Sequence, residues 1–127
     1  MLLLKDLLEY MKTLFPDVEK WGIGLIDRNA PKVIGLYSRK GRLRPQAIGG
    51  ASYDIKSVTL LVHWGRSYTE AEKQAYSIYR KLIETSSREQ IGNHSCWFDI
   101  FSEPVCIDRD EHGNYEFVLD FDVYYRL

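Results

Sequence analysis

The chain has 127 residues, with 17 Lys and Arg against 18 Asp and Glu. Its length predicts one domain over residues 1–127, and its near-zero net charge argues against a general nucleic-acid coat. Because 45% of the residues are hydrophobic and 28% are charged, the composition excludes a disordered chain.

The cysteines and the apolar start bear on the cellular compartment. Cys96 and Cys106 are too few for a disulfide-stapled secreted scaffold and lack the spacing of a zinc site, so we expect reduced, cytosolic thiols. The run Met1–Leu4 is broken at once by Lys5 and Asp6, which predicts no signal peptide. No apolar run approaches the roughly 20 residues that span a bilayer.

The first part of the chain predicts one helix followed by two strands. Apolar residues recur at helical spacing from Leu4 to Phe15, and Pro16 ends that helix. Two short β-branched and aromatic runs, 21–26 and 33–37, flank the turn-forming segment 27–31. This arrangement favours a β-hairpin.

A long loop is predicted at about residues 38–54, because this segment has no sustained periodicity and contains three glycines and a proline. Compact domains rarely carry such a loop without a use for it. Residues 55–64 then alternate as a strand with one polar-tending face. Residues 69–72 match a capping box, which predicts a second helix from there to about Thr85.

The last third of the chain predicts strands. Residues 96–102 and 105–108 are separated by Pro104, which indicates a bend or an edge position. After a turn at 110–114, residues 115–125 alternate between an aromatic or aliphatic face and a largely acidic one. The sequence therefore predicts an α+β domain in the order α-β-β-β-α-β-β(-β). Its sheet is expected to be mostly antiparallel, with two helices packed on one face.

No group of reactive side chains forms a pattern typical of catalysis. The two glycines of residues 22–24 are not followed by the helix N-terminus that a phosphate loop needs, and the three histidines are far apart. Glu116, Asp120 and Asp122 share one strand face, which is most simply an acidic, solvated face. We expect no enzyme activity, no cofactor and no bound metal.

Charge is segregated along the chain. Segment 99–122 carries eight acids and Arg109 as its only Lys or Arg. Two surfaces of opposite charge favour head-to-tail contact between subunits, whereas two solvated surfaces are the plainer alternative. Between Asp27 and Asp54 lie six basic residues and no acid: Arg28, Lys32, Arg39, Lys40, Arg42 and Arg44.

A contact between subunits would need aromatic burial as well as charge. Exposed ion pairs contribute only about 0–1 kcal/mol each, whereas tyrosine rings bury area while their hydroxyls stay satisfied. The predicted assembly surface therefore combines both kinds of side chain: Arg39, Lys40, Arg42, Arg44, Tyr53, Asp120, Asp122 and Tyr124.

The alternative function is a small nucleic-acid-binding module that uses the basic loop 39–44. Four phosphate contacts from this loop would give a salt slope of about −3.6. Such a slope would be a clear signature of duplex binding.

Several segments, in their order along the chain, resemble a known family. They are Leu3–Pro16, Ile34–Tyr37 with Arg39–Arg42 and Gly49–Gly50, Ser52–Lys56 with Leu60–Trp64, Glu103–Pro104, Gly113–Phe117 and Tyr124–Arg126. In these segments the chain resembles the small minor capsid proteins of tailed phages and prophages of Gram-positive bacteria, of the tail-terminator or tail-completion type.

The resemblance implies a non-enzymatic virion protein that acts in head-tail joining or tail termination. It implies a six-fold ring that docks on the tail tube and the head connector. A monomeric state of the isolated protein is the alternative. The implied partners are other copies of the chain, the major tail protein and head-tail connector proteins, with transient contact to DNA and none to membranes. The implied location is the virion, and the host cytoplasm during assembly. The resemblance carries over no catalytic, cofactor or metal residue.

Overall fold

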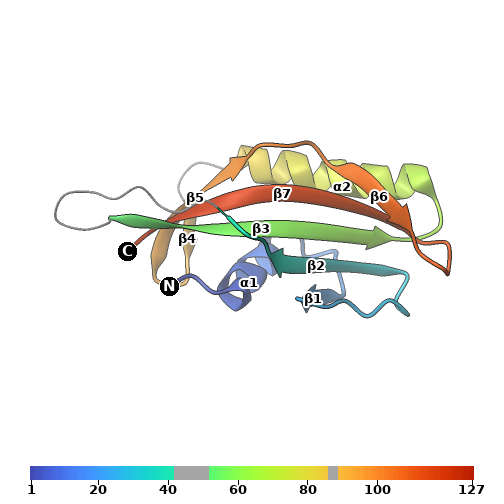
Figure 1. Cartoon of the computed structure of the whole chain (residues 1–127), viewed down its shortest axis with the longest axis horizontal. Coiled ribbons are helices and arrows are strands. Elements are labelled where there is room, and N and C mark those ends of the chain that lie inside the picture. Colours follow the sequence, from blue (N-terminus) through green and yellow to red (C-terminus); the bar gives the residue numbers. More distant parts are fainter. Residues whose placement is uncertain (42–51, 86–88) are drawn as a thin grey trace.

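The computed structural model describes residues 1–41, 52–85 and 89–127. The predicted α+β class is confirmed, because the described residues form two helices beside a curled seven-stranded sheet (Figure 1). In chain order the elements are α1 (Leu4–Leu14), β1 (Trp21–Ile23), β2 (Lys32–Ser38), β3 (Tyr53–Trp64), α2 (Tyr68–Glu84), β4 (Glu89–Ile91), β5 (His94–Ile100), β6 (Val105–Arg109) and β7 (Tyr115–Arg126).

The long strand β7 organises the sheet, whose order is β1-β2-β3-β7-β5-β4. One side of β7 pairs with β3, and its other side pairs first with β6 and then with β5. The chain leaves β7 between Ile100 and Val105, which confirms the bend predicted at Pro104. Every strand pair is antiparallel except β1 with β2.

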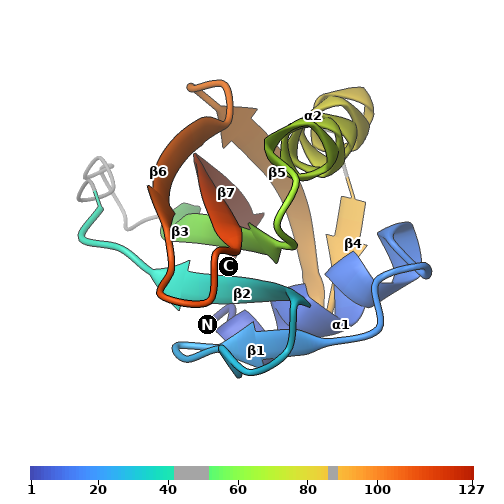
Figure 2. The ribbon, with the colours of Figure 1, turned by 90° about the vertical axis from the view of Figure 1, so that its right-hand side faces the viewer.

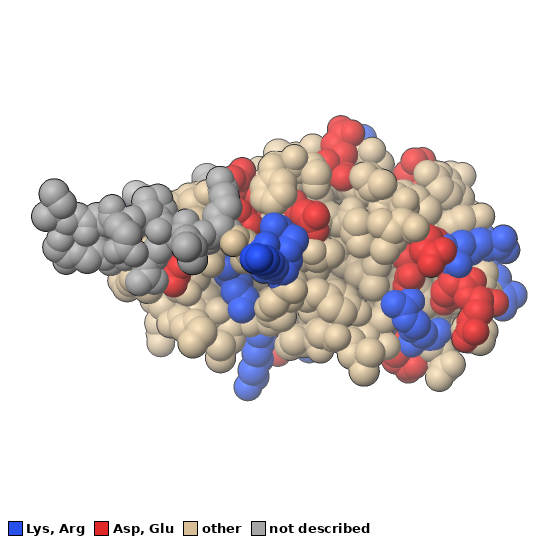
Figure 3. All heavy atoms as spheres, in the orientation of Figure 1, with Lys and Arg blue, Asp and Glu red and all other residues tan. Residues whose placement is uncertain are grey.

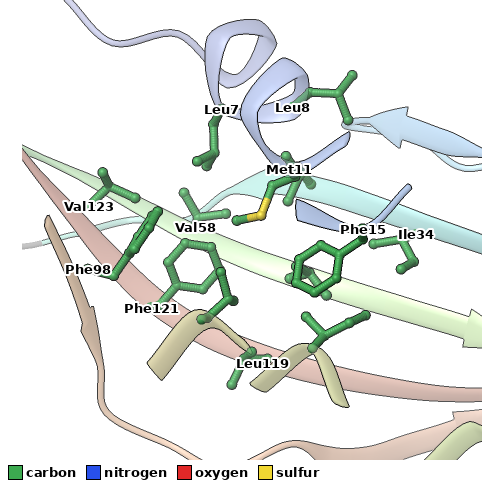
Figure 4. Close-up of a cluster of buried hydrophobic side chains, with 14 of the residues drawn as sticks. Leu7, Leu8, Met11, Phe15, Ile34, Val58, Phe98, Leu119, Phe121 and Val123 are labelled. Atoms are coloured by element: carbon green, nitrogen blue, oxygen red, sulfur yellow. The ribbon is translucent and has the colours of Figure 1, made fainter. Parts of the chain in front are cut away.

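Both helices lie on one face of the sheet, as predicted (Figure 2). Their buried residues join those of the strands in the main hydrophobic core. Figure 4 shows Leu7 and Met11 of α1 pointing toward Val58 and Phe121 of the sheet. The face opposite the helices, here called the outer face, is left for other contacts.

The start of α2 differs from the prediction. Ser67 is the N-cap, and its hydroxyl accepts a hydrogen bond from the Glu70 amide at 3.3 Å, so the capping box predicted at residues 69–72 is wrong. The chain turns at Gly65, whose φ of 70° is unfavourable for residues with a Cβ, directly after β3 ends. This early turn lets Ser67, rather than Thr69, take the cap position.

The β-hairpin predicted for residues 21–37 is also wrong. β1 runs parallel to β2, with Trp21 opposite Ile34. After β1 the chain turns at Gly24, which has a φ of 69°, and crosses to the outer face. There Ile26 and Ala30 are buried in a second, smaller core with Val33 and Leu61. Burial of these two side chains on the outer face explains why the segment does not form a direct hairpin.

Candidate functional site

The outer face carries most of the predicted assembly residues. On β7 the odd-numbered side chains from 117 to 125 belong to the main core, so the even-numbered ones lie on the outer face. The strand register then places Ser57 and Asp99 on either side of Asp122, and Thr59 opposite Asp120.

Arg39, just after β2, joins the acidic residues of β7. Its Nη2 lies 2.9 Å from Asp122 Oδ1 and also donates to the Phe121 carbonyl at 3.1 Å. Its Nε lies 3.8 Å from Asp120 Oδ1, which accepts a hydrogen bond from Thr59 at 2.6 Å. The structure therefore brings three of the predicted residues together, and it pairs them within one chain.

A second arginine repeats this arrangement near the start of β7. Arg28, in the crossing segment between β1 and β2, forms an ion pair with Glu116. The Glu116 side chain is 6% exposed and that of Asp122 is 2% exposed, so the prediction of a wholly solvated acidic face is wrong. Buried carboxylates need a partner, and the arginines of the basic segment supply one.

As a result, the outer surface mixes both signs of charge. Figure 3 shows Lys and Arg next to Asp and Glu at two places on the face in view. Lys40 is exposed after the paired Arg39, whereas Arg42 and Arg44 lie outside the described residues. The predicted loop at about 38–54 lies partly outside them too: β2 ends at Ser38 and β3 begins at Tyr53.

An aromatic cluster lies at the end of the sheet where β3 begins. Tyr124 of β7 stacks on Trp97 of β5, with ring centroids 5.6 Å apart and planes at 16°. Tyr53 of β3 lies 5.9 Å from the Tyr124 ring and 6.2 Å from the Trp97 ring. The predicted assembly surface did not include Trp97, although this residue lies on a predicted strand. Only the register of β5 against β7 shows that Trp97 lies beside Tyr124.

At the opposite end of the sheet, His63 is fully buried on the outer face beside Asp110. Its Nε2 lies 2.9 Å from Asp110 Oδ2, although neither ring nitrogen makes a hydrogen bond of good geometry. Burial lowers the pKa of His63, and Arg28 acts in the same direction against the charges of Glu116 and Asp110. The neutral form of His63 is therefore favoured in the folded protein.

Asp110 is held by the turn that precedes β7. Its Oδ1 accepts hydrogen bonds from the amides of Asn114 at 2.8 Å and His112 at 3.0 Å. Burial by itself raises the pKa of Asp110, but the hydrogen bonds outweigh this effect and lower it. The carboxylate thus shapes a turn, and the histidine beside it belongs to the packing of that turn.

The burial of neutral His63 predicts a loss of stability in mild acid. The unfolded chain binds a proton at this side chain near pH 6.5, whereas the folded protein resists it. This contribution is fully present above about pH 6.5 and declines as the pH falls below it. Urea midpoints measured between pH 8 and 5 should therefore decrease toward acid in the wild type.

Two variants test whether His63 causes this acid sensitivity. His63→Phe should flatten the decrease, while His112→Phe, at an exposed turn position, should retain it. An unchanged decrease in His63→Phe would show that another group is responsible.

The described residues contain no group of three or more His, Cys, Asp or Glu side chains that could hold a metal ion. Cys96 is buried, Cys106 is half-buried, and both are free thiols. Within the same part of the chain, neither helix is long and apolar enough to cross a membrane. The outer face is thus characterised by paired charges and stacked rings.

Comparison with known proteins identifies the family. The model of a family described as bacteriophage tail terminator protein matches residues 4–126, and no curated protein matches the chain. This match confirms the resemblance to phage proteins of the tail-terminator type, which are structural parts of the virion. Since the match covers nearly the whole sequence, the chain belongs to the bacteriophage tail terminator family.

Proposed function

We propose that this protein ends tail assembly by forming a ring that caps the tail tube and joins it to the head connector. The observation that carries the proposal is the family match over residues 4–126. The proposed partners are other copies of the chain, in a six-fold ring, together with the major tail protein and the head-tail connector proteins. Assembly would take place in the host cytoplasm before the protein enters the virion.

The contacts on the outer face suggest two different roles for the residues of the proposed assembly surface. Arg39 holds the chain against Asp122 where the connection from β2 to β3 begins, and its amide donates to the Ser57 carbonyl at 3.1 Å. At the far end of that connection, the Leu127 amide donates to the Ser52 carbonyl at 3.1 Å. Arg39, Asp120 and Asp122 would thus hold the base of the connection within each subunit.

The remaining predicted residues would make the contact itself. Tyr53 and Tyr124 belong to the aromatic cluster next to the place where the connection enters β3. Tyrosine rings in such a position can bury apolar surface against a neighbouring subunit while their hydroxyl groups stay in contact with water. Lys40, Arg42 and Arg44, on the connection itself, would steer the neighbouring subunit into register.

Charge reversal on the connection tests this proposal. The double variant Arg42→Glu/Arg44→Glu should fold with an unchanged melting temperature but form neither rings nor capped tails. The readout is electron microscopy of the protein alone and together with tubes of the major tail protein.

The matched control is Lys5→Glu/Lys12→Glu, which makes the same change of charge at exposed positions of α1. This control should assemble normally. Wild-type assembly by the Arg42→Glu/Arg44→Glu variant would contradict the proposed role of the connection.

The pairing of Arg39 with Asp122 weakens the DNA-binding alternative. This ion pair neutralises one of the four basic residues of the loop 39–44 that would have to bind phosphates. A salt slope near −3.6 for binding to duplex DNA would revive this alternative.

A further inference from the structure

The curled sheet ends in strands that lack a second partner. Among the described residues β1 pairs only with β2, β4 only with β5, and β6 only with β7. β6 forms the upper margin of the sheet in Figure 1, and β1 forms the lower one. The free side of such an edge strand, here called an open margin, leaves a row of backbone N–H and C=O groups unpaired. Another strand can bind to these groups.

Two of these margins also expose large apolar side chains. On β6 the exposed fractions are 57% for Val105 and 55% for Ile107, and the exposed charges of Asp108 and Arg109 follow only at the end of the strand. At β1 they are 42% for Ile23 and 77% for Leu25, the second residue after the strand. Proteins protect open margins with charges or covering elements, so an apolar open margin indicates a surface that a partner covers.

The margin at β4 lacks this feature. Ile91 is 1% exposed, and the other two residues of the strand are Glu89 and Gln90. The open apolar margins among the described strands are therefore the two at β1 and β6, at opposite sides of the fold.

We propose that β6 of one subunit pairs with β1 of the next, so that the sheet continues from subunit to subunit. The exposed Val105 and Ile107 would then cover Ile23 and Leu25 of the neighbour. The occupant is a second copy because one chain carries both margins, and joining them covers each margin of every subunit. Such a contact is head-to-tail, and it closes into a ring when the rotation between subunits allows.

This inference rests on the proposed ring and names the contact that builds it. Pairing of identical margins is the alternative geometry: β6 against β6, or β1 against β1, would give a two-fold dimer. The two geometries differ in which residues become neighbours, so crosslinking separates them.

The first experiment uses a Cys106→Ser background, which removes the half-buried thiol next to Ile107. In this background Ile23→Cys and Ile107→Cys are made singly and together, and a short bis-maleimide is added to the protein assembled with tubes of the major tail protein. The double variant should give a ladder of covalent multimers. Each single variant should give no covalent multimers. Covalent dimers from either single variant would overturn the head-to-tail pairing.

The second experiment uses charge to block the margins. Ile23→Lys and Ile107→Lys should each abolish rings while retaining the melting temperature. Ile83→Lys, at a 44% exposed position of α2, should leave the rings intact. Intact rings in both margin variants would overturn the strand pairing and leave the proposed function standing. Absence of rings in the wild type with tubes would overturn both.

Discussion

Replacing Phe121 with alanine is expected to lower the free energy of unfolding by about 3–5 kcal/mol. Phe121 is fully buried on β7, and its ring packs edge-on against Phe98 with centroids 5.8 Å apart. It belongs to the core that both helices share, so the cavity left by the ring would be lined by several elements (Figure 4). Urea unfolding monitored by circular dichroism measures the loss.

The control for this variant is Phe101→Ala. The Phe101 side chain is 52% exposed and lies 5.1 Å from the Arg39 guanidinium. Its loss should cost below about 1 kcal/mol, since an exposed cation–π contact contributes little. Similar losses in Phe121→Ala and Phe101→Ala would contradict the described core.

Replacing Arg39 with methionine is expected to cost about 2–3 kcal/mol, which is below the 3–5 kcal/mol typical of fully buried pairs. Methionine keeps most of the apolar stem but removes the guanidinium that lies 2.9 Å from the buried Asp122 carboxylate. The cost is reduced because the Arg39 side chain is 26% exposed, so that water reaches part of the site. The measurement is again the urea midpoint.

Two further variants test the reason for this loss. Lys40→Met, at the exposed neighbouring position, should change stability by less than about 0.5 kcal/mol. Asp122→Asn added to Arg39→Met should recover part of the loss, because the buried group then carries no charge. A neutral Arg39→Met variant would show that the pair does not hold the end of β2 to β7.

The sequence predicts best those elements whose apolar residues repeat with a clear period. The helix predicted over Leu4–Phe15 is observed as Leu4–Leu14, and the strand predicted over 115–125 is observed as Tyr115–Arg126. These patterns identify the side chains that face the main core, and both helices and the sheet contribute to that core. Local periodicity was therefore sufficient for the fold class.

The sequence could not give the direction in which strands pair. Alternation identifies the buried face of a strand but not its partner, so β1 and β2 were predicted to form a hairpin. The parallel pairing depends on burying Ile26 and Ala30 against Leu61, a contact between residues distant in the chain. No local pattern carries that information.

The site was predictable only as a list of residue types. Segregated charge indicated separate basic and acidic surfaces, but Arg28 and Glu116 are 88 residues apart in sequence and adjacent in the fold. Arg39 and Asp122 are likewise 83 residues apart. The pairing of β2 with β3 and of β3 with β7 brings these residues near one another, and the register of β5 against β7 brings Trp97 onto Tyr124.

Electron microscopy of tail tubes assembled with and without this protein tests the central claim most directly. Tubes of the major tail protein should reach a uniform length and carry a ring at one end only when the protein is present. Tubes whose lengths and ends are the same with and without the protein would contradict a role in tail termination.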